Sequence, residues 1–145
     1  MATQQQRKDT RFSSVEKRIH KHGVGFLVYN NKDIVNTVMG CRPVSSGLIL
    51  LLLRAVPFNI RIVQAYAPTS DYGDNEIEEF YDQLQNVINQ TPNKDTLVVQ
   101  GDWNAKVGKD ACGNVCNDDT NERGLRLVEF ASFNDLVLAN AFGHH

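Results

Sequence analysis

The chain has 145 residues, of which 41% are hydrophobic and 22% charged, and its formal net charge of −2 is ordinary for a globular protein with one hydrophobic core. The longest apolar run, Leu48–Leu53, is far shorter than the ~20 residues that a membrane helix needs, and the polar start MATQQQRKDT excludes a signal peptide. The three cysteines are an odd and sparse set, so we expect an intracellular protein, cytoplasmic or nuclear, that is not secreted and does not contact a membrane.

Charge is distributed unevenly along the chain. Residues 1–22 hold six Lys and Arg against two Asp and Glu, whereas residues 23–145 hold nine against fifteen. We therefore expect a basic, disordered leader over 1–22 and a folded, acidic domain over 23–145. A sharper interpretation makes the leader a phosphate-contacting or nuclear-targeting arm. An acidic domain that handles a polyanion needs a divalent cation or a local basic groove to offset the repulsion.

The first half of the domain has the pattern of strands. Strands are predicted over residues 23–29 and 34–39, with a break at 40–43 caused by Gly40 and Pro43. The apolar run at 48–55 predicts a central strand, and Ile60 to Ala65 alternates in the way of a second one. The turn around Pro57 joins these two strands as an antiparallel hairpin.

A helix follows the polar loop at 70–74. Asp74 or Asn75 is the predicted N-cap of this helix. Its apolar positions recur at helical spacing on one face: Ile77, Phe80, Tyr81, Leu84, Val87 and Ile88. A helix between two strands predicts a crossover that makes the strands 60–65 and 96–100 parallel. Their carboxyl ends then meet at one edge of the sheet, which brings Tyr66 and Asp102 together where open α/β sheets bind ligands.

The stretch 95–108, DTLVVQGDWNAKVG, carries the chemistry that the sequence suggests. A buried strand ends there with Asp102 and Asn104, and strand alternation predicts that both side chains point the same way. An acid beside an amide suits a substrate that needs one water oriented and one anionic oxygen held. The alternative is that both residues only cap the end of the strand, and Trp103 between them is expected to pack in the core.

Other site types have little support. The four histidines lie at positions 20, 22, 144 and 145, outside the central part of the domain, which argues against a Ser/His/Asp or Cys/His mechanism. Cys112 and Cys116 lack partners for a zinc site, and the acidic loop 109–121 lacks the spacing of a calcium loop. A second helix is predicted from the cap Asn121 to about Asn134, with Leu125, Val128 and either Ala131 or Ser132 on one face. A strand over 136–139 is predicted to follow. The fold class is therefore α/β or α+β with a mixed sheet.

The run Gly101–Gly108 resembles the GD(F/W)N signature of the endonuclease/exonuclease/phosphatase family, and Tyr66-Ala67-Pro68 resembles its YAP element. The family includes exonuclease III-like repair nucleases and the endonuclease domains of non-LTR retrotransposons. Further segments in the same order are similar to retrotransposon-derived members: 22–26, 43–46, 78–81 and 121–124. The resemblance covers about residues 20–143.

The resemblance implies a four-layer α/β sandwich of the DNase I-like type, with mixed sheets and outer helices, of which this chain is a central fragment. It implies Mg²⁺-assisted hydrolysis of a phosphodiester, with DNA as the expected substrate. Asp102 would orient or deprotonate the attacking water, Asn104 would hold that water or a phosphate oxygen, and the Tyr66 hydroxyl would contact the scissile phosphate. Thr69, expected to bind substrate, stands where many members carry an Asn.

The sequence departs from the family at the metal site. The metal-binding Glu expected before Gly23 has no counterpart in residues 1–22, and the closing Asp-His pair is also missing, so no metal ligand is assigned. We therefore expect little activity from this chain alone. The alternatives are a catalytically dead, retroelement-derived binding or scaffold module, and a phosphatase acting on a small molecule. Exposed strands, above all Leu48–Leu53, are expected to favour self-association.

Overall fold

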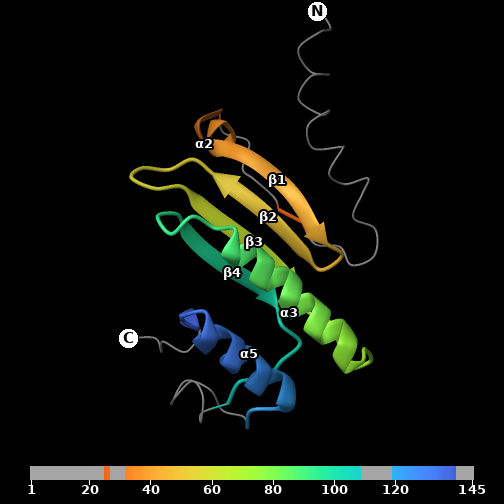
Figure 1. Ribbon diagram of the computed structural model, residues 1–145. Coiled ribbons are helices and arrows are strands. Elements are labelled where there is room, and N and C mark those ends of the chain that lie inside the picture. The colour runs from red at the N-terminus through yellow and green to blue at the C-terminus, as the bar shows by residue number, and fades with distance from the viewer. Residues whose placement is uncertain (1–24, 27–31, 109–118, 140–145) are drawn as a thin grey trace, which may run out of the picture.

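The computed structural model describes residues 25–26, 32–108 and 119–139 (Figure 1). The predicted leader and most of the predicted loop at 109–121 lie outside these residues. So does most of the predicted strand at 23–29, of which Gly25 and Phe26 are described and have no regular secondary structure. No helix in the described part of the chain is long and apolar enough to cross a membrane.

A four-stranded mixed sheet forms the centre of the molecule, with the strand order β1-β2-β3-β4. Strands β2 (Leu48–Leu53) and β3 (Ile60–Tyr66) form the predicted antiparallel hairpin, and β3 runs parallel to β4 (Thr96–Asp102) as the crossover predicted. The mixed α/β class is thus confirmed. The part of the chain that the structure describes contains one sheet, and the four-layer sandwich with a second sheet stays a prediction.

The region before the hairpin differs from the prediction. Residues expected to form a strand begin instead with a short helix, α2 (Lys32–Thr37), and the expected break at Gly40 and Pro43 lies inside strand β1 (Val38–Ser45). The ladder between β1 and β2 has irregular register on either side of this stretch. Among the described strands β1 is an edge strand, where a proline is tolerated because its missing N–H is not needed by a second neighbour.

Strand β2 is the most buried part of the sheet, which corrects the expectation that it would be the most exposed. Leu48 to Leu51 are 0–5% exposed. Leu48 and Leu50 belong to the core that lies against helix α3 (Asp74–Asn89), which crosses one face of the sheet (Figure 1). The α3 side of this core contains the predicted apolar positions: Ile77, Phe80, Tyr81, Leu84 and Val87. The burial of Leu48–Leu51 removes the reason given for self-association through β2, and self-association itself stays a prediction.

Both helix caps can be compared with the sequence. Gly73, rather than the predicted Asp74 or Asn75, is the N-cap of α3, and Asp74 is its first helical residue. Helix α5 (Glu122–Phe133) has the predicted cap, since the side chain of Asn121 accepts a hydrogen bond from the amide of Gly124.

The buried face of α5 agrees with the prediction at Ala131 and differs from it at Leu125. Leu125 is 52% exposed, whereas the buried positions are Gly124, Leu127, Phe130 and Ala131. This face is set by aromatic packing, because Phe130 lies against Tyr81 of α3 with ring centroids 4.9 Å apart. The predicted strand at 136–139 is also wrong: after the helix the amide of Leu136 bonds back to the carbonyl of Ala131 at 2.8 Å.

Polar contacts hold α5 beside α3. The Arg126 guanidinium donates to both carboxylate oxygens of Glu78 at 2.9 Å and lies 4.5 Å from the centre of the Tyr81 ring. Asn134 and Gln85 exchange hydrogen bonds of 2.7 and 2.9 Å through their amides. Burial raises the pKa of Tyr81 to about 12, so its ring acts as a neutral packing surface.

Candidate functional site

The carboxyl ends of β3 and β4 bring the predicted site residues together. Tyr66 is the register partner of Asp102, and the amide of Ala67 continues the ladder by donating to the Asp102 carbonyl at 2.8 Å. Val63 belongs to the core under α3, and side chains alternate along a strand, so Tyr66 and Asp102 lie on the sheet face away from α3. The predicted meeting of these two residues at one edge is confirmed.

Glycine is required immediately before the acid. Gly101 has a φ of 146°, and a Cβ at this position would lie 1.8 Å from the carbonyl oxygen of Ala65. A side chain would therefore push β4 away from β3 just where Asp102 pairs with Tyr66. The glycine of the motif acts by allowing the two strands to approach.

Asn104 reaches the site by a turn and not by strand alternation. Strand β4 ends at Asp102, and Asn104 has a φ of 47°, in the left-handed region that Asn tolerates better than most residues. The turn is closed by the Asn104 amide, which donates to Oδ1 of Asp102 at 2.9 Å. The prediction that Asp102 and Asn104 point the same way through strand alternation is therefore wrong, because the strand ends at Asp102 and Asn104 lies in the turn that follows.

The side chain of Asn104 joins the two loops that leave the sheet. Its Nδ2 donates to the carbonyl of Ala67 at 2.7 Å. A carboxamide has two N–H donors and one oxygen acceptor, so this bond uses one donor and leaves the other groups for further contacts. The loop after β3 and the loop after β4 are thus held at a fixed separation by a residue of the motif.

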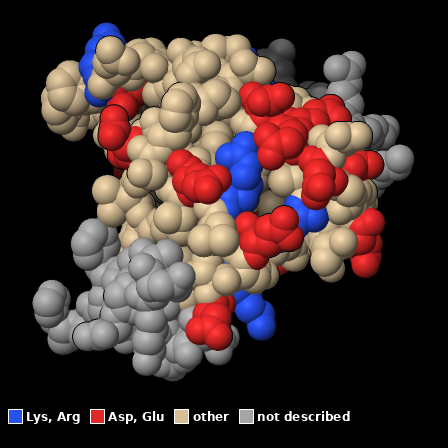
Figure 2. Space-filling view, turned by 60° about the horizontal axis from the view of Figure 1, so that its bottom comes forward, with Lys and Arg blue, Asp and Glu red and all other residues tan. Residues whose placement is uncertain are grey.

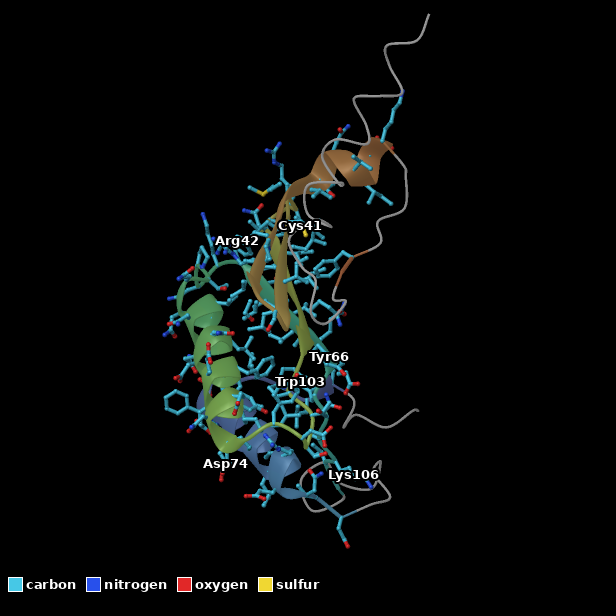
Figure 3. The ribbon with its side chains drawn as sticks, turned by 90° about the vertical axis from the view of Figure 1, so that its right-hand side faces the viewer. Cys41, Arg42, Tyr66, Asp74, Trp103 and Lys106 are labelled. Carbon is cyan, nitrogen blue, oxygen red and sulfur yellow. The ribbon has the colours of Figure 1, made fainter. Side chains whose placement is uncertain are left out.

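Trp103 fixes the same loop from the opposite side of the sheet. Its ring meets that of Phe80 edge to face, with centroids 6.2 Å apart and planes at 81°, and it packs against the core under α3. The predicted core role of Trp103 is confirmed. Figure 3 shows Tyr66 and Trp103 at the same end of the sheet, with Cys41 and Arg42 farther along it.

Thr69 lies in the loop that follows Tyr66. The structure shows a contact of its backbone, whose carbonyl accepts from the amide of Tyr72 at 3.1 Å, so a substrate-binding role for its side chain stays a prediction. Nearby, a cleft of about 150 Å³ is bordered by Ser45, Ser46, Tyr66, Tyr72, Glu76 and Glu79. The two carboxylates disfavour a phosphate in this cleft.

Helix α5 supports the site loop in a way that the sequence did not predict. Oδ1 of Asn121 accepts from the amides of both Lys106 and Gly124, at 3.0 and 2.8 Å, while the Asn121 amide donates to the Lys106 carbonyl at 3.1 Å. A Cβ on Gly124 would lie 1.8 Å from that carbonyl oxygen. Gly124 could have predicted this contact from the sequence. A glycine destabilises a helix, so a glycine at the third helical position indicates that another backbone segment approaches closely there.

The described residues do not form a magnesium site by themselves. Among them no group of three His, Cys, Asp or Glu side chains converges, and Oδ1 of Asp102 at the site edge already accepts a hydrogen bond from the Asn104 amide. Mg²⁺ demands six ordered oxygen ligands, of which this edge supplies few. The edge offers hydrogen-bonding groups to a polar ligand: a carboxylate, a carboxamide and a phenol.

Comparison with known proteins gives the relationship of the chain. No protein-family model matches it. It is 35% identical over 129 residues to craniofacial development protein 2 of Tragulus javanicus, with 86% of the chain aligned, and equally so to that of Bos taurus. The chain is a homologue of craniofacial development protein 2. It spans 22% of the length of these two relatives.

A solved structure with some likeness is the endonuclease domain of TRAS1, a telomere-specific non-LTR retrotransposon. The match has a TM-score of 0.48 and 22% sequence identity, and it covers 62% of this chain and 36% of that domain.

Proposed function

We propose that the carboxyl edge of β3 and β4 is part of the site of a phosphodiester hydrolase of the endonuclease type, with DNA as its substrate. The observation that carries the proposal is the register of Tyr66 with Asp102, with Asn104 bridging the two loops beside them. An acid, an amide and a phenol at one sheet edge supply the groups that hydrolysis of a phosphodiester needs. The GDWN and YAP motifs, which carry the family resemblance, are the residues that build this edge.

Each side chain has a role that follows from its chemistry. The Asp102 carboxylate accepts a hydrogen bond from the attacking water and orients it, and Oδ2 is the oxygen not engaged by the Asn104 amide. The Tyr66 hydroxyl donates to a non-bridging oxygen of the phosphate, where negative charge develops. Asn104 keeps the two loops at the separation that places these groups on either side of the phosphate.

Magnesium dependence is part of the proposal and has its own consequence. Among the described residues no three Asp, Glu, His or Cys side chains converge, so further metal ligands would have to come from elsewhere. We therefore expect the isolated chain to bind a duplex and to nick plasmid DNA poorly. Robust Mg²⁺-dependent nicking by this chain that disappears in Asp102→Ala would contradict the expectation of low activity and would support the nuclease assignment.

The binding site can be tested without activity. Amide resonances of the isotopically labelled chain would be followed while a short DNA duplex is added at low salt. We expect the shifts to concentrate at Tyr66, Asp102 and Asn104, with Lys94 at the opposite end of β4 unaffected. Asn104→Gly tolerates the positive φ but loses the bond to Ala67, and it should weaken binding while the fold is kept. Shifts spread over α3 instead, or none at all, would overturn the proposal.

A second candidate is a catalytically dead binding or scaffold module. It is favoured by the lack of a cluster of three metal-ligating side chains among the described residues and by the acidic character of α3, which carries five Asp and Glu and no Lys or Arg. Titration with Mg²⁺, followed by calorimetry and by the Asp102 resonance, separates the two. Specific binding near Asp102 at sub-millimolar metal would count against a dead module.

A further inference from the structure

The surface of the described residues is poor in positive charge. They hold eight Lys and Arg against thirteen Asp and Glu. Arg61 and Arg126 are used in ion pairs with Asp95 and Glu78. Figure 2 shows acidic side chains gathered on the face at the lower end of the molecule, with few basic ones between them. A polyanion at this end of the sheet therefore needs a cation placed where it binds.

Lys106 is placed at that end. It follows Asn104 by two positions in the loop that leaves β4, it is exposed, and it lies at the same end of the sheet as Tyr66 (Figure 3). Lys94 precedes β4, and Arg54 follows β2, which is antiparallel to β3, so both belong to the opposite end. Arg123 also lies near the site loops, but its guanidinium donates to the Tyr72 carbonyl at 3.1 Å.

The backbone of Lys106 is held on both sides. Asn121 accepts from its amide at 3.0 Å and donates to its carbonyl at 3.1 Å, so one residue closes a two-way clamp. Gly124 lets the first turn of α5 approach the same carbonyl closely. The start of α5 also turns the positive end of its dipole toward this loop. A long, flexible side chain thus starts from a fixed point beside the site.

We propose that Lys106 binds a backbone phosphate of the nucleic acid, next to the phosphate held at Tyr66 and Asp102, and that Asn121 positions it. The proposal rests on the proposed function, because it needs a nucleic acid at this edge. An ammonium group makes such a contact as a point charge and does not read sequence. Its signature is the release of condensed counterions from the duplex.

The test is a salt series on the full chain with a fluorescent DNA duplex, measured by anisotropy between about 50 and 200 mM salt. Lys106→Ala should weaken binding about fivefold at the low end and reduce the slope of log K against log salt by about 1. Lys106→Arg should keep the slope of the parent chain. Lys94→Ala, an exposed lysine at the other end of β4, is the matched control and should change neither quantity.

Asn121→Ala tests the positioning. It keeps the charge of Lys106 and removes the clamp, so we expect the slope to stay while affinity falls about threefold through the cost of ordering a looser side chain. Trp103, the only tryptophan in the chain, packs beside the loop and reports by its fluorescence whether each variant is folded. An affinity for Asn121→Ala equal to that of the parent chain would overturn the positioning role.

The outcomes separate the two proposals. If the parent chain binds the duplex and Lys106→Ala behaves as Lys94→Ala does, the role of Lys106 is wrong and the proposed function stands. If the parent chain binds no duplex at low salt, both are wrong. The proposal is supported if the slope of log K against log salt is reduced in Lys106→Ala and equals that of the parent chain in Lys106→Arg.

Discussion

The two ends of the parallel pair β3 and β4 are held together by different interactions. At the amino end Arg61 donates to Asp95 at 3.0 Å, and the side chains are only 17% and 3% exposed. At the carboxyl end the strands are joined by backbone bonds and by the Asn104 amide, and Asp102 is exposed. One end is thus closed by a desolvated charge pair, and the other keeps its carboxylate open to solvent.

The difference shows how stability and chemistry are separated along one pair of strands. A buried ion pair is costly to break, because the remaining charge is left without a partner away from water. A carboxylate that is to meet a ligand cannot be neutralised in this way. The carboxyl end is instead fixed through groups that do not use up the site, namely the close approach at Gly101 and the packing of Trp103 on Phe80.

The largest effect is expected at the carboxyl end from Gly101→Ala. The new methyl group would meet the Ala65 carbonyl oxygen, and the backbone conformation there is strained for any residue with a side chain. We expect a loss of about 4 kcal/mol of unfolding free energy, measured by urea denaturation. Gly40→Ala is the control, since its Cβ would lie 3.8 Å from Leu52 in ordinary contact. Equal stability of the two variants would show that the strands do not approach closely at the site.

A smaller effect is expected at the amino end from Asp95→Ala. Removing the buried carboxylate leaves Arg61 unpaired, and we expect a loss of about 3 kcal/mol in unfolding free energy. Exposed Lys94→Ala next to it should change stability by less than about 0.5 kcal/mol. Replacing both partners by Arg61→Met and Asp95→Leu should restore most of the loss. Because this end carries no ligand group, folded Asp95→Ala should bind the duplex as tightly as the parent chain does. Weakened binding would contradict the separation of stability at the amino end from ligand binding at the carboxyl end.

The smallest effect concerns the exposed charge pair between the helices, which contrasts with the buried pair of the sheet. Hydrogen bonding by Arg126 lowers the pKa of Glu78, so the pair stabilises the fold above the unfolded pKa of about 4.3 and loses that contribution as pH falls through the lowered value. Because Glu78 is 57% exposed, Glu78→Gln should cost only about 0.5 kcal/mol at neutral pH. Thermal melts across pH would show the difference from the parent chain vanishing in acid. Asp82→Asn, an exposed change on the same helix, should show no such pH-dependent loss.

Local pattern was enough for the elements with a clear period. The apolar face of α3, the hairpin of β2 and β3 and the cap at Asn121 are as predicted, because their signals lie within a few neighbouring residues. Pattern failed where packing outweighs propensity. Strand β1 runs through Gly40 and Pro43, and α5 is rotated so that Phe130, rather than Leu125, faces Tyr81.

The sequence by itself determined which residues could carry chemistry and, through the order strand–helix–strand, that Tyr66 and Asp102 meet at one sheet edge. Tertiary structure alone decided how they are held. The bond of Asn104 to Ala67 and the clamp of Asn121 on Lys106 join residues that are 37 and 15 positions apart. No local pattern encodes such contacts, because they depend on how close two backbones come once the helices are packed on the sheet.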